Sequence, residues 1–206
     1  VDMYGQVRME ELEDILSPPT QIVSMIWGQG EIGTIQPIVK VGKACQSRGI
    51  IFHTDATQIL SQGNISWNDL PIDLLSATAH KFQGPKGIGF LLCNTNRKQL
   101  ISPLYGGGSQ EDGYRSGTEP VSLIAGMALA IQLLNRSITS SDGSSVNEFQ
   151  KVSALTKKLR SELLHIQSTH LPGHPDNRLT HHISRLVGNI NNQALPCRAI
   201  VRELPF

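Results

Sequence analysis

The sequence is poor in charged and aromatic residues and contains no long apolar stretch. Charged residues make up 17% and aromatic residues 5% of the 206 residues, and the formal net charge is +1. This balance offers no basic surface of the kind that binds nucleic acid or anionic membranes, so we expect neither partner. No run of about 18 apolar residues occurs, which predicts that no helix spans a membrane. The acidic N-terminal stretch VDMYGQVRMEELEDIL also differs from the basic and then apolar pattern of a signal peptide.

Cysteine is scarce as well, with three residues far apart in the sequence, Cys45, Cys93 and Cys197. They form no C-x-x-C motif, so we expect no disulfide framework. Three buried or incidental thiols suit a reducing compartment, and we expect a cytoplasmic protein. The chain begins at Val1 without an initiator methionine and ends at Phe206 after an apparent helix start. We therefore expect both ends to belong to a longer protein.

Short apolar runs alternate with a helical segment in the first half of the chain. Apolar runs of strand length occupy 21–27, 50–54, 74–79 and 87–93, and the run at 50–54 is rich in β-branched and aromatic residues. Residues 37–48 predict a helix, because Pro37 suits a first helical turn and Gly49 a C-terminal stop. Such alternation indicates an α/β domain with a mostly parallel sheet. Asp55 and Lys81 each follow a strand, so we expect both at the sheet edge where these folds bind ligands.

The second half of the chain predicts two long helices and the beginning of another domain. Residues 120–135 are apolar nearly all round, which is typical of a helix buried against a sheet or a partner subunit. A linker at 137–145 precedes a helix whose apolar stripe we interpret as core, formed by Phe149, Val152, Leu155, Leu159 and Leu163. We predict a three-layer α/β/α large domain at 1–136, incomplete at its N-terminus. Residues 137–206 would form a linker, a connecting helix and the incomplete start of a small α/β domain.

A glycine motif between the first strand and the first helix resembles a dinucleotide-binding fingerprint. Residues 28–33 read G-Q-G-E-I-G, and Asp55 follows at the end of the next strand. Two details favour a tight loop instead. Pro37 places the start of the helix about three residues too late for this motif, and the Glu31 carboxylate would repel a pyrophosphate. A nicotinamide-binding domain is thus the weakest of the functional alternatives.

A second group of residues supplies the chemistry that a phosphorylated pyridine aldehyde requires. Such a ring needs a carboxylate at its nitrogen, a lysine that reacts with the aldehyde, and donors for the phosphate. Asp55, Lys81, Thr78 and His80 provide these groups at the ends of neighbouring strands. Lys81 must lose its proton to react, so we expect little water around it. Taken singly, Lys81 could face solvent, Asp55 could cap a helix and His80 could be a satisfied core histidine.

These residues, in this order, resemble the cysteine desulfurase family within the class-V aminotransferase-like enzymes of fold type I, which use pyridoxal phosphate. The matching segments are GEIGTIQPI, GIIFHTDATQ, ATAHKFQGPKGIGFL, YGGGSQEDGYRSGTEP and, more weakly, GHPDNRLTHHIS. The resemblance implies that Lys81 binds the cofactor as a Schiff base and that Asp55 pairs with its pyridine nitrogen. It further implies that Gln58 hydrogen-bonds the ring hydroxyl and that Thr78 and His80 hold the phosphate.

The resemblance also implies a reaction and partners. Thr118 would reach the phosphate of a neighbouring subunit in a homodimer. The enzyme would convert L-cysteine to L-alanine and leave a persulfide on one of its cysteines. That sulfur would pass to an acceptor or scaffold protein for iron–sulfur clusters. No metal site is implied, and the H-x-x-x-H spacing of His170 and His174 lies in a proline-rich loop.

The sequence departs from the family pattern at several positions. Gly30 stands where an asparagine usually hydrogen-bonds the ring hydroxyl, a role that Gln29 would have to take over. Asp112 replaces a usual basic residue, and Thr78-Ala79 stands for Ser-Gly. The ring-stacking histidine would precede Val1, and the persulfide cysteine and substrate-binding arginine would follow the last residue. Two alternatives therefore stay open, another class-V enzyme (a selenocysteine or C–S lyase, or a transaminase) and a catalytically silent fragment that binds or dimerises without turnover.

Overall fold

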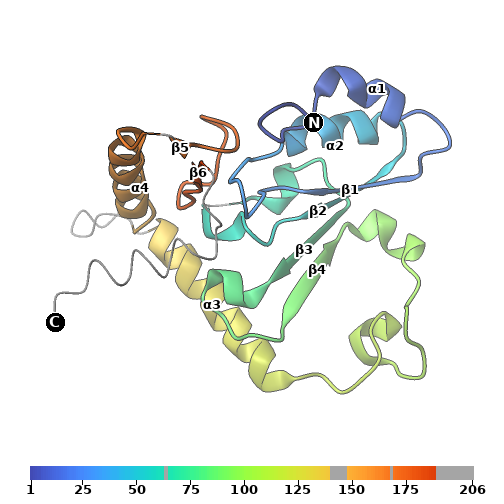
Figure 1. The fold of residues 1–206 in the computed structure, drawn as a ribbon. Coiled ribbons are helices and arrows are strands. Elements are labelled where there is room, and N and C mark those ends of the chain that lie inside the picture. Colours follow the sequence, from blue (N-terminus) through green and yellow to red (C-terminus); the bar gives the residue numbers. More distant parts are fainter. Residues whose placement is uncertain (63–64, 140–147, 168, 189–206) are drawn as a thin grey trace.

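The computed structural model describes residues 1–62, 65–139, 148–167 and 169–188 (Figure 1). Four strands form one sheet in the order β1-β2-β3-β4. The strands are β1 (Ile22–Ile26), β2 (Ile51–Asp55), β3 (Leu74–Thr78) and β4 (Gly89–Cys93). β1, β2 and β3 are parallel, and β4 pairs antiparallel with β3. The expected strands and the mostly parallel α/β sheet are confirmed.

The register of the sheet brings the carboxyl ends of the parallel strands to one edge. Ile26 pairs with Asp55, and Asp55 pairs with Ser76. The Ala56 N–H then donates to the Ser76 carbonyl at 2.9 Å, which extends the pairing past the end of β2. The segments that follow β1, β2 and β3 therefore leave the sheet side by side, as ligand-binding α/β folds require.

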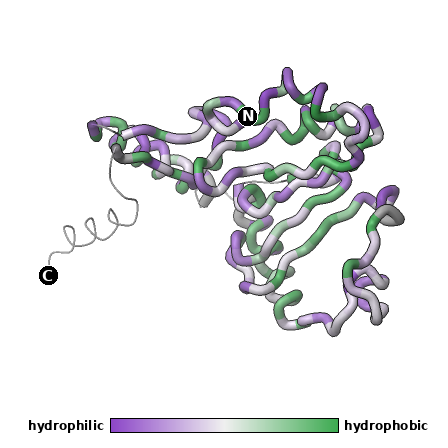
Figure 2. The backbone as a smooth tube through the Cα atoms, turned by 45° about the vertical axis from the view of Figure 1, so that its right-hand side comes forward, coloured by the Kyte–Doolittle hydropathy of each residue, from purple (hydrophilic) through white to green (hydrophobic). Residues whose placement is uncertain are grey.

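One face of the sheet is covered by α2 (Ile38–Gln46), which lies against the strands in Figure 1. Val41 and Cys45 are fully buried against Phe52 in the main apolar cluster. Figure 2 shows apolar stretches along the backbone, interrupted by polar ones. On the other face, Ile22 and Leu91 remain 56% and 53% exposed. Within the described residues, helices therefore shield one side of the sheet more completely than the other.

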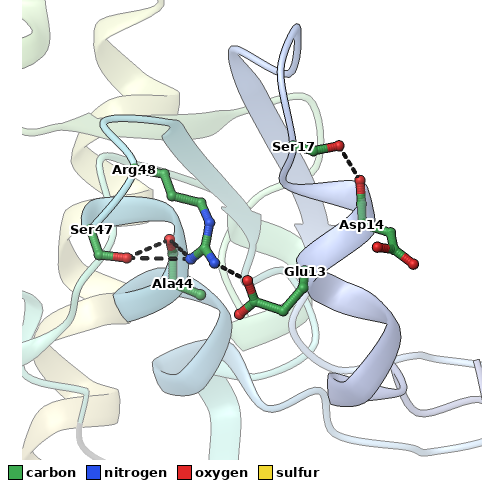
Figure 3. A network of polar contacts seen from close by, with 6 residues as sticks. All are labelled: Glu13, Asp14, Ser17, Ala44, Ser47 and Arg48. Atoms are coloured by element: carbon green, nitrogen blue, oxygen red, sulfur yellow. Dashed lines mark hydrogen bonds and ion pairs between the residues drawn. The ribbon is translucent and has the colours of Figure 1, made fainter.

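A polar contact joins the first helix to the end of α2. Arg48 donates to the Glu13 carboxylate of α1 (Leu12–Ile15) and, at 3.0 Å, to the Ala44 carbonyl (Figure 3). The backbone turns at Gly49 with a φ of 70°, a conformation that favours glycine and ends the helix as expected. Leu12 of α1 is buried against α2. The ion pair therefore adds a polar contact between two helices that already pack through apolar side chains.

The long helix α3 (Val121–Thr139) is packed on one side only. Ala130 is buried, and Met127 packs against the same cluster as Phe82. Leu129 and Leu133 are exposed. The expected helix is confirmed, and it is only partly buried within the described residues. Among those residues, no helix is both long enough and apolar enough to cross a membrane.

The helix α4 (Glu148–Leu164) forms as expected, but its apolar stripe is not core within the described residues. Val152, Leu155 and Leu159 are all exposed. For these three residues the prediction was wrong, because helical periodicity shows which face is apolar and not what covers it. Leu163 is half-buried, and the side chain of Phe149 lies outside the described residues. The expected linker overlaps the end of α3, and residues 140–147 lie outside the described residues.

The segment after α4 returns to the large sheet. It contains the short strands β5 (Thr169–His170) and β6 (Leu186–Val187). Between them, the Leu179 N–H donates to the Gly33 carbonyl and the Ile35 N–H to the Asn177 carbonyl, both at 2.8 Å. Residues 171–182, named here the return segment, therefore pack on the loop that follows β1. A domain boundary at 137 stays a prediction.

Candidate functional site

The segment that carries Lys81 is held by its two apolar neighbours. It is the 3-10 helix η4 (Ala79–Phe82), which directly follows β3. Ala79 and Phe82 are buried and pack with Ala130 of α3. Lys81 itself is exposed. The buried residues therefore anchor the backbone while the amine stays accessible, and the dry surroundings expected for Lys81 are absent among the described residues.

A tight turn follows the lysine. Gln83 adopts the left-handed conformation that ends η4, with φ 66°. At Gly84, a Cβ atom would lie 2.8 Å from the Ala79 Cβ. Such a contact is shorter than real side chains tolerate, so this position requires glycine. The turn folds the chain back into β4 and holds η4 at the sheet edge.

Asp55 is the last residue of β2 and is half-buried. Its Oδ1 accepts the Thr57 N–H at 2.8 Å, so the carboxylate caps the turn that leads to the 3-10 helix η2 (Leu60–Gln62). That helix contacts η4, the helix of Lys81. The structure thus brings the segments of Asp55 and Lys81 together at the same edge.

Thr78 and His80 form a pair beside the lysine. The Thr78 Oγ1 lies 3.1 Å from the His80 Nδ1 and donates to the Ile88 carbonyl at 3.2 Å. Since the hydroxyl hydrogen goes to that carbonyl, Oγ1 accepts from His80, which places the imidazole proton on Nδ1. His80 is exposed and Thr78 half-buried, so both groups can reach a ligand at the end of β3.

The loop after β1 contacts the Asp55 segment through Gly30. A Cβ atom at Gly30 would lie 2.8 Å from the Gln58 Nε2. The Gln58 amide therefore occupies the space into which a side chain at position 30 would extend. The Gln29 side chain is tied to its own loop, because its Oε1 accepts the N–H groups of Glu31 and Ile32.

The same hydrogen bonds argue against a dinucleotide site. A pyrophosphate would need free N–H groups at the glycines and a helix that opens there. Here two loop N–H groups bind Gln29, and the Gly33 N–H donates to the Gln29 carbonyl at 2.9 Å. The helix α2 begins only at Ile38. The glycines serve a tight loop, so the nicotinamide alternative is set aside.

Thr118 is exposed in the loop before α3. Among the described residues, no hydrogen bond joins it to Lys81, Asp55, Gln58, Thr78 or His80. Its contribution to a site shared between subunits stays a prediction.

A histidine of β2 connects three strands beside Asp55. The His53 Nδ1 lies 2.8 Å from the Ser24 Oγ of β1, and its Nε2 lies 3.0 Å from the Ser76 Oγ of β3. Burial lowers the pKa of His53, and the Asp55 charge opposes that shift. The neutral ring suits a position between two hydroxyls, where one nitrogen donates and the other accepts.

The return segment supplies contacts that sequence reasoning missed. The Arg178 guanidinium is buried and donates to the carbonyls of Pro172, His174 and Ile32 at 3.1–3.3 Å. Burial, with the nearby Arg160 charge, lowers the pKa of Arg178. Leu179 is fully buried, and Gly28 approaches it closely enough that a Cβ would lie 2.8 Å from its Cδ2. The only signal in the sequence was the weak match of GHPDNRLTHHIS.

Comparisons with known proteins agree with this arrangement. The sequence matches the family described as Aminotransferase class-V over residues 1–196. It is 39% identical to a mitochondrial cysteine desulfurase of Saccharomyces cerevisiae, over 86% of this chain and 34% of that protein. It is 38% identical to the cysteine desulfurase IscS of Methanosarcina thermophila, over 95% of this chain and 46% of that protein. The chain thus spans between a third and a half of the length of these relatives.

Solved structures show the same fold. A NifS-like protein from Rickettsia africae superimposes with a TM-score of 0.84 at 29% identity, over 94% of this chain and 52% of that one. The structure of SspA in complex with cysteine gives a TM-score of 0.74 at 29% identity, over 98% of this chain and 53% of that one. With the family match covering nearly the whole sequence, the chain belongs to the class-V aminotransferase family of pyridoxal phosphate-dependent enzymes.

Proposed function

We propose that this chain binds pyridoxal phosphate covalently through Lys81. The observation that carries the proposal is the position of Lys81 and Asp55 on contacting segments at one sheet edge. Lys81 offers an exposed amine. The Asp55 Oδ1 is held by the Thr57 N–H, and within the described residues its Oδ2 has no hydrogen-bond partner. An amine and a half-buried carboxylate oxygen without a partner fit the two ends of one pyridine aldehyde.

The other residues of the site have roles suited to their positions. Asp55 would keep the pyridine nitrogen protonated through a charged hydrogen bond. Thr78 and His80, paired at the end of β3, would hold the phosphate, for which the Thr78 hydroxyl would turn its hydrogen from the Ile88 carbonyl to a phosphate oxygen. Gln58, whose amide lies beside Gly30, would hydrogen-bond the ring hydroxyl. When bound, the cofactor supplies an electron sink for the substrate carbanion.

For the whole protein we propose the cysteine desulfurase reaction. L-cysteine would be converted to L-alanine, and its sulfur would pass to an enzyme cysteine and then to an acceptor for iron–sulfur clusters. The names of the relatives and the bound cysteine of SspA support this choice over other class-V reactions. We further propose a cytoplasmic homodimer in which Thr118 of one subunit reaches the phosphate of the other.

We also propose that this chain binds the cofactor without turnover on its own. Burial, reinforced by the Asp73 charge, raises the pKa of the Cys45 thiol. The persulfide-forming group must be a thiolate that a substrate can reach, and Cys45 is fully buried. Cys93 lies within β4, on a strand and not on a mobile loop, and Cys197 lies outside the described residues.

The test is chemical trapping. The purified chain is mixed with pyridoxal phosphate, reduced with borohydride, digested and analysed by mass spectrometry. We expect a phosphopyridoxyl group on the peptide that contains Lys81, and none there in Lys81→Ala. Lys86→Ala, a matched change of another exposed lysine close by, should label Lys81 as the unchanged chain does. Labelling spread evenly over exposed lysines would contradict the proposal.

A further inference from the structure

The side chain of Gln62 has a fixed orientation. Its Oε1 accepts from the Thr180 backbone N–H and from the Thr180 Oγ1, each at 2.8 Å. A backbone N–H can only donate, so the amide atom that faces Thr180 must be oxygen. The amide nitrogen then faces the return segment on the other side, where it contacts the His181 Nδ1.

This orientation sets the state of His181. Since the Gln62 Nε2 carries only donor hydrogens, the His181 Nδ1 must accept, and an accepting Nδ1 means a neutral ring with its proton on Nε2. Within the described residues this Nε2 has no hydrogen-bond partner. His181 thus offers one N–H donor at Nε2, while Gln62 holds the ring at Nδ1.

His181 is close to the lysine. Gln62 belongs to η2, and η2 packs against η4, which carries Lys81. Burial by the neighbouring segments lowers the pKa of His181, and the charges of His182 and Lys81 lower it further. Among the described residues, no carboxylate acts to raise the pKa of His181. Positive charge on Lys81 therefore favours the neutral form of the His181 ring.

We infer that His181 belongs to the Lys81 site and donates its Nε2–H to an anionic oxygen of the molecule bound there. The inference rests on the proposed function of Lys81. Two sources offer such an oxygen, namely the phosphate of the cofactor and the carboxylate of an amino-acid substrate. A neutral donor binds either one without adding a second positive charge beside the lysine, and a charged oxygen strengthens the hydrogen bond.

The state of the ring is tested first by NMR on the cofactor-free chain. We expect Nε2–H as the tautomer of His181. We also expect a higher pKa for His181 in Lys81→Ala, because a nearby positive charge is removed, and in Gln62→Leu, because Nδ1 no longer accepts a hydrogen bond there. An Nδ1–H tautomer, or a pKa that Lys81→Ala leaves unchanged, would overturn the inference even if trapping at Lys81 succeeds.

Binding then identifies the anionic oxygen. We compare His181→Leu with the matched control His170→Leu, an exposed histidine of β5, and with His181→Asn, which keeps a donor. About a tenfold weaker affinity of His181→Leu for pyridoxal phosphate, with pyridoxal unchanged, would assign the phosphate. Unchanged cofactor affinity with weaker binding of L-alanine, but not of ethylamine, to the loaded chain would assign the carboxylate.

Three further outcomes separate the inference from its premises. If His181→Leu changes none of these affinities, the inference fails while the cofactor site stands. If all four ligands weaken equally, or if His170→Leu has the same effect, the role of His181 is structural and the inference also fails. If the unchanged chain is not labelled at Lys81 by borohydride, the proposed function fails first.

Discussion

The two carboxylate oxygens of Asp55 have different surroundings. Oδ1 accepts the Thr57 N–H at 2.8 Å, whereas Oδ2 has no hydrogen-bond partner within the described residues. The first contact orients the side chain at the end of β2. The second oxygen is the one that a protonated pyridine nitrogen would meet. In our proposal, Asp55 thus combines a structural contact with a functional one, and a substitution can separate them.

Asp55→Asn should weaken pyridoxal phosphate binding by at least about tenfold and leave the fold intact. The asparagine Oδ1 can still accept from Thr57, but a neutral amide lacks the charge that stabilises a protonated nitrogen. The measurement is the affinity by titration, with thermal melting as a check on folding. The control is Asp69→Asn, which changes an exposed aspartate elsewhere. Equal affinities for both variants would contradict the role assigned to Asp55.

Sequence reasoning located Asp55 and Lys81 in the fold better than it located their surroundings. Both could be placed at the ends of strands, because strand ends are visible in a sequence. The sequence did not show that the Gln58 amide occupies the space beside Gly30, because that contact joins two separate loops. The sequence also predicted that Lys81 is shielded from water, whereas it is exposed, because local sequence does not show what covers a side chain.

At the scale of elements, β1 to β4 and α2 were predictable because each carries its own pattern. The strands show short apolar runs, and α2 shows helical spacing between Pro37 and Gly49. The return segment could not be predicted in the same way. Thr180 and Gln62 bind each other across a sequence separation of 118 residues, and irregular segments that pair at such a distance leave no periodicity.

The return segment depends on one glycine. Gly173 has a φ of 79°, and a Cβ there would lie 2.2 Å from the Ile32 carbonyl oxygen. Gly173→Ala should therefore lower the free energy of unfolding by roughly 2–4 kcal/mol, since backbone must move in addition to the strained φ. Urea denaturation measures this value.

The matched control for that prediction is Gly87→Ala. Gly87 has a similar φ of 87°, but nothing lies within 4 Å of its Cβ position. Only the cost of the left-handed conformation remains, about 1–2 kcal/mol. If both variants lose the same stability, the packing of the return segment on the loop after β1 contributes nothing measurable.

At the scale of the whole molecule, the fold lowers the pKa of three histidines. Burial is the largest cause that lowers the pKa of His53, His181 and His182 from the ordinary value of 6.5. Below that value the unfolded chain takes up protons that the folded chain does not. The folding equilibrium therefore shifts toward the unfolded chain as the pH falls.

Stability should be constant above about pH 6.5–7 and should decline as the pH falls through about 6.5 toward the lower folded-state pKa values. Urea midpoints measured across this window test the direction. His53→Gln keeps an acceptor and a donor between Ser24 and Ser76 but cannot titrate, so its decline should be shallower. A midpoint that rises on acidification would show that the histidines are not held neutral.

The central claim is that Lys81 and Asp55 bind opposite ends of one ring, and a crystal structure of this chain with pyridoxal phosphate tests it most directly. We expect a bond between the Lys81 Nζ and the aldehyde carbon, with the pyridine nitrogen within hydrogen-bond distance of the Asp55 carboxylate. A ring attached to Lys81 whose nitrogen points away from Asp55, or a cofactor bound elsewhere on the chain, would contradict the account.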